Sequence, residues 1–564
     1  MFRRLSGAGS VLPVIALTVA SCQLFAGLAC RGATPEVRGV WLTTTNEDHI
    51  RTGVNTAAVV TQLRNIGLNT VYVEAWKNGY TNFPSQTLQA LIGAADRNPL
   101  LGGSRDLVQE TLTQAHRNGM SYYAWFEYGA IAQYIGAGGS PSNPLAVYMK
   151  NRGWLLQNQA GQYADGTNGG FAYMNIAVPE VRQFLVDLTL EAVSRYDLDG
   201  VQFDDHMTWP VNFGFDATTI SLYTAQTGNR APTSSGDAQF SQWRQQQVTD
   251  FAAQLYSAVK TARPDLEFSV SPSITPFSTT NYNANWPQWE SAGLFDEFAV
   301  QLYRSNISSF NSIVNAQVSP FEPDDIEKLV FGLSINGLTT TPWSDLRQMI
   351  ERSRSVGAGG HSLWYSGGLL ANYATELSEF YDVPENGQAA NPRFVADHRP
   401  PPAVAVVDAP GEWTVEVATP GRFRVVVRSG SSPIWREYAV VQLAEGERQL
   451  SVPGASEVEL LVDHRSETTF FGDFDGNGQI DGADFLGWQR GFGSTVTAGT
   501  HGDFNHDSRV DGADLPYWRL NLGLIVSPPS AIPYAVAEPS STRLAGIVAI
   551  AASVTFFVRG LDRQ

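Results

Sequence analysis

The sequence predicts an α/β fold, a (β/α)8 barrel of the TIM type over residues 34–383. Eight short runs rich in β-branched and aromatic residues recur there, and each precedes a segment whose apolar residues return every three or four positions. Near-continuous apolar strands alternating with helices favour a closed parallel barrel. The eight predicted strands are 37–43, 69–76, 122–128, 200–205, 267–273, 298–304, 329–336 and 360–366.

An open, doubly wound sheet is the alternative fold, because a strand pattern does not show whether a sheet closes. Such sheets often carry a glycine-rich turn after the first strand, where they bind a phosphate group. Here Thr43, Thr44, Thr45 and Asn46 follow the first strand instead. The barrel is therefore preferred.

Composition sets outer limits on organisation and partners. A chain of 564 residues is too long for one hydrophobic core, so several domains are expected. The net charge of −18 repels nucleic acid and anionic lipid, so neither is an expected partner. The two cysteines, Cys22 and Cys30, lie near the start of the chain, so no disulfide or thiolate metal site is expected in the folded region.

Both ends of the chain carry targeting signals. Arg3 and Arg4 precede an apolar run at 11–20, which predicts a secretory signal peptide over residues 1–33, with lipidation at Cys22 as one processing route. Residues 527–564 form a linker and an apolar tail that is short for a membrane span and resembles a PEP-CTERM sorting signal. The protein is thus expected to be secreted or attached to the cell envelope, with membrane contact only through these segments.

Two further modules are predicted between the barrel and the tail. Residues 384–402 are rich in proline, asparagine and alanine and read as a linker. Residues 403–466 alternate apolar and polar residues and break at Gly and Pro, which predicts a small β-sandwich that supports the barrel or binds carbohydrate.

A twofold repeat at 467–526 predicts structural calcium binding. Oxygen-bearing side chains recur at every second position, with a final carboxylate at position 12, as in loops that wrap a hard cation. The first loop offers Asp473, Asp475, Asn477, Gln479, Asp481 and Asp484, and the second offers Asp503, Asn505, Asp507, Arg509, Asp511 and Asp514. Gln479 and Arg509 would bind through their backbone carbonyls. The repeat resembles a type I dockerin, and that resemblance implies calcium and a possible cohesin-type protein partner.

If the barrel is correct, chemistry takes place where its strands end. Carboxylates, amides and aromatic rings gather at these positions, and this mixture suits a sugar. The expected catalytic residues are Asp204, Asp205, Glu127 and Glu74. The expected substrate-binding residues are Trp41, Trp76, Gln202, His206, Gln301, Tyr303, Asn336, Trp364 and Tyr365.

The fourth predicted strand carries the sharpest signal. Strand alternation places Gln202, Asp204 and His206 on one face, so Asp204 points into the barrel mouth. Adjacent acids on a buried strand cost free energy unless they are hydrogen-bonded or catalytic. Asp204 is preferred to Asp205 as a catalytic group, although either could cap a helix or hold a loop.

The proton donor is less sharply defined. Glu127 is the first choice, because the aromatic neighbours Trp125, Phe126 and Tyr128 could desolvate it and raise its pKa. Glu74 is the second choice. Each could instead be a satisfied carboxylate that only binds substrate.

The barrel resembles a known family. Arg38-Gly39-Val40-Trp41, Val71-Tyr72-Val73-Glu74, Tyr123-Ala124-Trp125-Phe126 and above all the stretch 196–205, YDLDGVQFDD, are similar to the glycosyl hydrolase-like 10 family over about residues 36–382. The resemblance implies a glycosidase-type barrel, with some members acting on bacterial cell-wall glycans. His206 and Glu127 stand where the family often has Tyr and Asn, so no single catalytic pair is transferred.

Two other functions remain open at this point. A zinc-dependent deacetylase could use Asp204, Asp205 and His206, but it needs further histidines nearby, and His49, His116 and His361 are isolated in the sequence. A non-catalytic, carbohydrate-binding barrel displayed at the cell surface is the alternative to a glycoside hydrolase. The main expectation is an extracytoplasmic hydrolase of a polysaccharide or a cell-wall glycan that needs no cofactor for catalysis.

Overall fold

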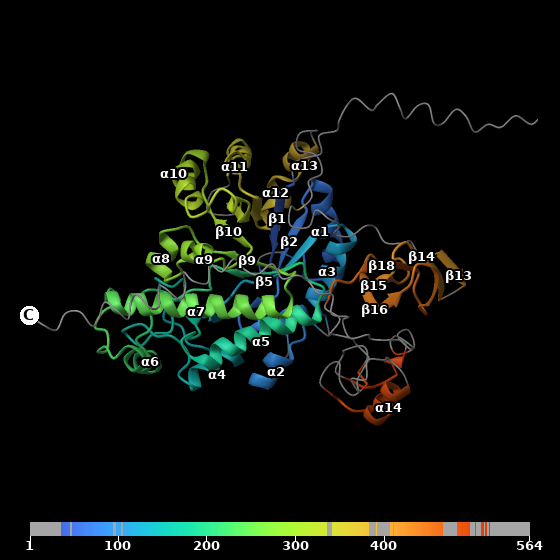
Figure 1. Cartoon of the computed structure of the whole chain (residues 1–564), viewed down its shortest axis with the longest axis horizontal. Coiled ribbons are helices and arrows are strands. Elements are labelled where there is room, and N and C mark those ends of the chain that lie inside the picture. The colour runs from blue at the N-terminus through green and yellow to red at the C-terminus, as the bar shows by residue number, and fades with distance from the viewer. Residues whose placement is uncertain are drawn as a thin grey trace, which may run out of the picture.

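The computed structural model closes eight parallel strands into a barrel (Figure 1). It describes residues 35–45, 48–93, 97–102, 105–335, 341–382, 391, 406–409, 411–465, 482–496, 502–503, 509–512, 514–515 and 518. Around the barrel the strands follow the order β1-β12-β11-β10-β9-β8-β5-β2. The strands are β1 (Val37–Leu42), β2 (Thr70–Glu74), β5 (Ser121–Phe126), β8 (Gly200–Asp204), β9 (Glu267–Ser271), β10 (Glu297–Gln301), β11 (Leu329–Ser334) and β12 (Gly360–Trp364). The prediction of a closed barrel is confirmed, and the open sheet is excluded.

Helices cover the outside of the barrel, and their ends follow capping rules. In α1, for example, the Thr52 side chain accepts a hydrogen bond from the backbone N–H of Asn55, and Gly67 ends the helix with a φ of 107°. The helices are α1 (Gly53–Ile66), α2 (Gln86–Ile92), α3 (Leu107–Arg117), α4 (Pro144–Asn151), α5 (Pro179–Arg195), α6 (Ala217–Thr227), α7 (Ala238–Ala262), α8 (Phe277–Tyr282), α9 (Trp286–Ser291), α10 (Ile307–Val318), α11 (Trp343–Ser355), α12 (Ser366–Asn372) and α13 (Ala374–Asp382).

Two short hairpins depart from a simple strand–helix alternation. The first joins β3 (Trp76–Lys77) to β4 (Tyr80–Thr81) after β2. The second joins β6 (Ile131–Tyr134) to β7 (Phe171–Tyr173) after β5. Both lie beyond the ends of barrel strands, so they add side chains to the barrel mouth.

Polar side chains fill the barrel interior and hydrogen-bond to one another. Trp41 Nε1 donates to Gln202 Oε1 at 2.7 Å, and Gln202 Nε2 donates to Ser269 Oγ at 2.8 Å. Ser269 Oγ and the Tyr72 hydroxyl then donate to Glu297 Oε1, at 2.7 and 2.8 Å. This chain of hydrogen bonds holds the inward face of β8 beneath Asp204.

Residues 406–462 form two three-stranded antiparallel sheets beside the barrel, drawn in orange next to α3 in Figure 1. The sheets share an apolar cluster to which both contribute buried residues, including Val415 and Val425. One sheet holds β13 (Val406–Ala409), β14 (Glu412–Val417) and β17 (Gly446–Ser451), and the other holds β16 (Trp435–Leu443), β15 (Gly421–Arg428) and β18 (Glu457–Val462).

Charged groups attach these sheets to the barrel near the base of β8. Buried Arg424 lies 3.2 Å from the Asp197 carboxylate and also donates to His116. His116 in turn contacts Asp199, the residue before β8, at 2.9 Å. The sheets therefore contact the end of the barrel where its strands begin, opposite the mouth.

The C-terminal region is described only in part. Helix α14 (Gly482–Gly491) packs Trp488 against Val510, and Trp488 Nε1 donates to the Asp511 carbonyl at 2.9 Å. These contacts join the two halves of the sequence repeat. The predicted signal peptide, the predicted 384–402 linker except Asn391, and the predicted sorting tail lie outside the described residues. Within the described part of the chain, no helix has both the length and the apolar character needed to cross a bilayer.

Candidate active site

Four carboxyl groups lie where three neighbouring strands end. Glu74 is the last residue of β2, Glu127 directly follows β5, and Asp204 ends β8 with Asp205 next to it. Since β2, β5 and β8 are neighbours in the barrel, these groups share one side of its mouth. Adjacent strands thus bring together acids that are far apart in the sequence.

Glu74 is fully buried and held by donors. Its carboxylate accepts from the Thr43 hydroxyl at 2.6 Å, the Thr44 backbone N–H at 3.0 Å, the Asn82 amide at 3.1 Å and Lys77 Nζ at 3.1 Å. Burial alone would raise the pKa of Glu74, but the Lys77 charge and the threonine donors outweigh it and lower that pKa. An ionised, fully bonded carboxylate is a poor proton donor, which argues against Glu74 as the acid.

Glu127 has the opposite character. Burial raises its pKa to about 8; the ammonium of Lys77, whose Nζ lies 2.5 Å from Glu127 Oε2, lowers the pKa, while the charge of Glu74 raises it. Glu127 therefore keeps its proton at neutral pH. Its side chain is 14% exposed, so a ligand in the mouth can reach it.

Asp204 and Asp205 form a coupled pair at the tip of β8. Gln301 Nε2 and the backbone N–H of Asp205 both donate to Asp204 Oδ1 at 2.7 Å. Burial and, after it, the charge of Asp205 raise the pKa of Asp204 well above its usual range. Asp205 is more exposed and accepts from Ser273 Oγ at 2.9 Å. The cluster thus holds more acid than its surroundings can keep ionised.

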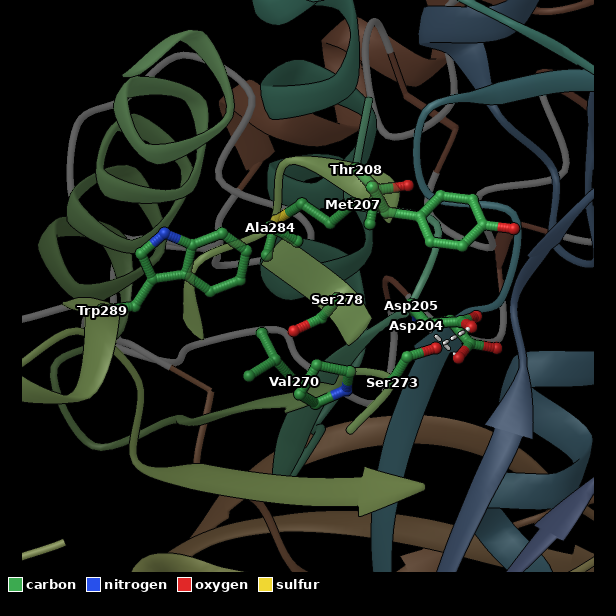
Figure 2. Close-up of a pocket in the computed structure, with 11 residues that line it drawn as sticks. Asp204, Asp205, Met207, Thr208, Val270, Ser273, Ser278, Ala284 and Trp289 are labelled. Carbon is green, nitrogen blue, oxygen red and sulfur yellow. Dashed lines mark hydrogen bonds between the residues drawn. The ribbon is translucent and has the colours of Figure 1, made fainter. Parts of the chain in front are cut away.

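A small pocket opens beside this pair. Figure 2 shows Asp204, Asp205 and Ser273 together at one side, with Val270 and Trp289 farther along the pocket. Met207, Thr208, Pro272, Ser278, Tyr282 and Ala284 complete the lining. Polar groups lie at one end of this pocket, and buried apolar side chains such as Trp289 close the other end.

Aromatic rings gather around Trp364 at the end of β12. Its ring centroid lies 5.6 Å from that of Trp125, 5.5 Å from Tyr365 and 6.1 Å from Tyr303, whose ring is nearly parallel to it. Trp364, Tyr365 and Tyr303 are partly exposed. Part of this aromatic cluster can therefore be reached from the mouth.

The structure places the predicted substrate-binding residues unevenly. His206, Gln301, Tyr303, Trp364 and Tyr365 lie at the mouth and are partly exposed. Asn336 lies outside the described residues.

Three predicted substrate-binding residues require correction. Trp41 and Gln202 are sealed inside the barrel by the network described above. Trp76 has no exposed surface, contacts Phe184 of α5 and donates to the Gly129 carbonyl. Trp76 sits in the two-residue strand β3 rather than at the end of β2, which turns its ring into the core.

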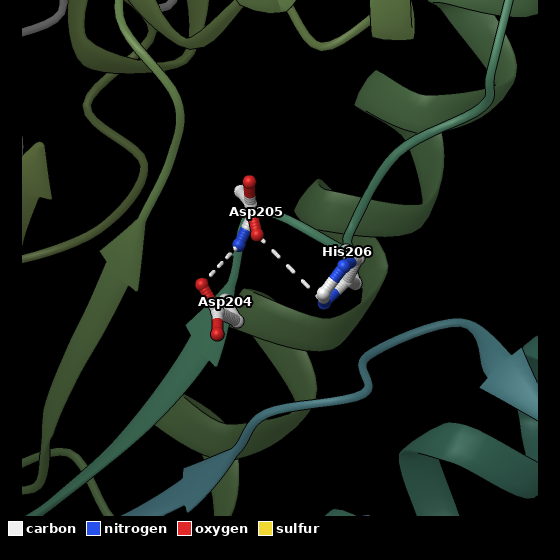
Figure 3. A group of neighbouring side chains, drawn as sticks. All are labelled: Asp204, Asp205 and His206. Atoms are coloured by element: carbon white, nitrogen blue, oxygen red, sulfur yellow. Dashed lines mark hydrogen bonds and ion pairs between the residues drawn. The ribbon is translucent and has the colours of Figure 1, made fainter. Parts of the chain in front are cut away.

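Asp204, Asp205 and His206 also come close enough to be considered as a metal site, since one ligand atom from each lies within 4.8 Å of the others (Figure 3). However, His206 Nδ1 faces the Glu127 backbone carbonyl at 2.9 Å and the Asp205 carboxylate only at 3.7 Å. No further histidine joins the cluster within the described part of the chain. The arrangement does not fit the zinc site of a deacetylase.

Lys77 is the functional residue that sequence reasoning missed. It lies three residues after Glu74, where a surface lysine is the ordinary expectation, and only the β3–β4 hairpin turns it back toward two acids. The i, i+3 spacing of Glu74 and Lys77 was the available signal. Its side chain is 12% exposed and bridges Glu74 and Glu127.

Comparison with known proteins agrees with this geometry. Residues 36–336, more than half of the chain, match the family described as Glycosyl hydrolase-like 10. The chain belongs to this family. The glycosyl hydrolase-like 10 match ends just after β11, so β12 with Trp364 completes the barrel beyond the matched residues.

Two curated relatives match this chain at low identity. Glycosyl hydrolase DigH of Escherichia coli K12 is 25% identical over 310 residues, which cover 47% of this chain and 65% of DigH. Glycosyl hydrolase YngK of Bacillus subtilis is 22% identical over 321 residues, covering 51% of this chain and 58% of YngK. The matched part of this chain thus spans less than two thirds of either relative.

A solved structure with a similar course of the chain is the PgaB (BpsB) glycoside hydrolase domain of Bordetella bronchiseptica. The TM-score is 0.46 at 16% identity, over 61% of this chain and 98% of that domain.

Proposed function

We propose that the barrel is an extracytoplasmic glycoside hydrolase that cleaves a polysaccharide or a bacterial cell-wall glycan. The observation that carries the proposal is the pairing of a protonated acid, Glu127, with the Asp204–Asp205 pair at one side of the mouth of a barrel from a glycosyl hydrolase-like family. Glycoside hydrolysis needs two carboxyl groups, one to donate a proton and one to act on the sugar carbon.

Glu127 is assigned the role of proton donor. Its pKa of about 8 leaves it protonated at neutral pH, so it can pass a proton to the glycosidic oxygen as the bond from that oxygen to the sugar carbon breaks. Lys77 contacts both Glu127 and the Glu74 carboxylate, and this bridge holds the Glu127 side chain in position. Water then supplies the hydroxyl group of the new reducing end.

Asp204 is assigned the second carboxyl. Two donors on Oδ1 fix its orientation and favour its ionised form, and they oppose the burial that raises its pKa. In that form it faces positive charge at the sugar carbon, as a nucleophile in a retaining route or as the base for water in an inverting route. Proton NMR of the first product anomer distinguishes the two routes.

Asp204→Asn is the direct test of the proposal. Peptide-free peptidoglycan strands and a panel of plant and algal polysaccharides are incubated with the wild type and the variant, and new reducing ends are counted by mass spectrometry. We expect the variant to lose at least about a thousandfold in turnover while unfolding at the same temperature as the wild type.

Asp187→Asn serves as a matched control, because it makes the same change on the exposed face of α5. Full activity in Asp204→Asn would remove Asp204 from the mechanism. Saturable glycan binding by a wild type that cleaves nothing in the panel would instead establish a carbohydrate-binding barrel.

We also propose that the C-terminal repeat binds two calcium ions and docks a cohesin-type protein. Among its proposed ligands, Asp484, Asp503 and Asp514 are fully buried, a burial that carboxylates tolerate well when they ligate a cation. Arg509 and Asp511 are also described, while Asp473, Asp475, Asn477, Gln479, Asp481, Asn505 and Asp507 lie outside the described residues.

Calcium removal provides the test of this second proposal. Chelation is expected to lower the unfolding temperature of the C-terminal region and to leave glycan turnover unchanged, because the barrel acids do not need the ion. Scanning calorimetry with and without calcium measures the unfolding temperature, and the reducing-end assay measures turnover. A C-terminal transition that is insensitive to calcium would contradict it.

A further inference from the structure

Two exposed aromatic rings flank the acids on opposite sides. Tyr134, in β6, is 55% exposed and Phe277, the first residue of α8, is 44% exposed. Among the described barrel residues they are the two aromatic side chains that stand out into solvent. A single exposed ring does not by itself indicate a binding site. The positions of Tyr134 and Phe277 relative to Asp204 are therefore the relevant observation.

The strand order defines those positions. Tyr134 belongs to the hairpin inserted after β5, and Phe277 belongs to the segment after β9. In the barrel, β5 and β9 are the two neighbours of β8, which carries Asp204 and Asp205. The two rings therefore stand on either side of the acids along the rim.

A run of rings leads from Tyr134 to the acids. The Tyr134 ring meets Phe171 edge-on, with centroids 5.3 Å apart, and Phe171 lies 5.1 Å from the His206 ring. His206 in turn is 3.7 Å from the Asp205 carboxylate. At 55% exposure, the Tyr134 ring still presents much of its surface to solvent.

The hairpin holds Tyr134 firmly. The Tyr134 backbone N–H donates to Asn78 Oδ1 at 3.0 Å, and the N–H groups of Ile135 and Gly136 both donate to the Gly170 carbonyl. Gly170 has a φ of 84°, and a Cβ there would come within 3.1 Å of the Tyr134 ring. These hydrogen bonds hold the backbone that carries Tyr134 in one conformation before any ligand arrives.

Phe277 is connected to the acids from the other side. Its ring centroid is 5.7 Å from that of Tyr282, and Tyr282 lines the pocket that contains Asp204 and Asp205. The backbone N–H and carbonyl of Thr275 are both bound by the Gln317 side chain, at 2.8 and 3.0 Å. This segment is therefore anchored as well.

We propose that Tyr134 and Phe277 bind sugars on opposite sides of the cleaved bond, so that the enzyme cuts within a glycan chain rather than at its end. The inference rests on the proposed hydrolase function. Sugar rings present an apolar face of C–H groups that stacks on aromatic rings, and binding on both sides of the acids requires a chain that continues in both directions.

Product analysis of the wild type is the first test. The substrate is the polymer that the wild type cleaves in the panel, with peptide-free peptidoglycan strands as the first probe. Internal cleavage shortens the average chain early, while release from an end yields small sugars from the start. Small sugars alone would overturn the inference and leave the hydrolase standing; no cleavage of any polymer would overturn both.

Binding by the inactive Asp204→Asn protein is the second test. Size-fractionated oligomers of the same polymer, from disaccharide to octasaccharide, are titrated by calorimetry into this protein with Tyr134→Ala or Phe277→Ala added. We expect each substitution to weaken binding of the longest oligomer by about tenfold, which corresponds to about 1.4 kcal/mol, and to weaken the shortest one less.

Tyr134→Trp and Phe277→Trp should retain affinity, because they keep an aromatic face. Phe492→Ala removes a ring that is 58% exposed in the C-terminal region and serves as the matched control. Long oligomers that bind equally well to the alanine variants would contradict the proposed positions, whatever the product pattern.

Discussion

The two ends of the barrel both bury charged groups, but they balance charge in opposite ways. At the end where the strands begin, burial would raise the pKa of Glu36, yet its hydrogen bond to Arg354 and the charges of Arg354 and Arg38 lower that pKa to about 2. At the mouth, Lys77 contacts Glu74 and Glu127 while Asp204 and Asp205 lie nearby. Buried charge that is fully paired supports the fold, whereas a surplus of acid marks the site of chemistry.

Glu74 sharpens the comparison. It lies at the mouth, but its charge is fully paired, as that of Glu36 is at the opposite end of the barrel. Its carboxylate is satisfied by hydroxyl, amide, backbone and ammonium donors, and its pKa is lowered. Position on the barrel is therefore less informative than the balance of donors around each acid.

The largest expected effect is that of Glu127→Gln. Removal of the proposed proton donor should reduce turnover about a thousandfold, measured as reducing ends released at neutral pH. The free energy of unfolding should not fall. Since the pKa of Glu127 is raised in the folded protein, its ionisation at neutral pH favours the unfolded chain, and glutamine removes this effect. Strong destabilisation would mean that Glu127 is structural, like Glu36.

Glu36→Gln should show the reverse pattern. The lowered pKa of Glu36 corresponds to about 3 kcal/mol of stability at neutral pH, and the variant should lose about that much in denaturant unfolding. Turnover per folded molecule should match the wild type. A catalytic defect without loss of stability would break the contrast between the two ends.

The lowered pKa of Glu36 also predicts how the free energy of unfolding changes at acidic pH. Because the folded pKa of Glu36 is about 2 and lies below the value of 4.5 for the free side chain, its contribution is present above pH 4.5 and is lost as the pH falls toward 2. Comparing wild type with Glu36→Gln across that range isolates the contribution. The difference in unfolding free energy between the two proteins should shrink as the pH falls.

The smallest expected effect is a shift in the pH profile. The wild type should lose activity on the alkaline side near pH 8, as Glu127 gives up its proton. Lys77→Met removes a charge that lowers this pKa, so the alkaline limb should move to higher pH, and Lys77→Arg should restore it. An unmoved limb with lower overall activity would indicate that Lys77 only supports the fold.

Periodicity alone was enough to predict the barrel, because each of its strands is buried on both faces and stands out as an apolar run. Strand alternation also placed Asp204 and Gln202 inward. The error at Trp76 arose because a turn after Glu74 starts a new two-residue strand, and alternation does not extend across a turn. The pairing of Lys77 with Glu127 depends on contact between elements distant in the chain, which local patterns do not encode.

The attachment of Arg424 to Asp197 and His116 has a consequence for how the chain can be divided. The proline-rich stretch after residue 383 looks like a place to cut, but a barrel ending there would lose the guanidinium that neutralises buried groups at the foot of the strand bearing Asp204. The two small sheets at 406–462 therefore support the strand that carries Asp204, and a cut between them and the barrel is expected to destabilise that strand.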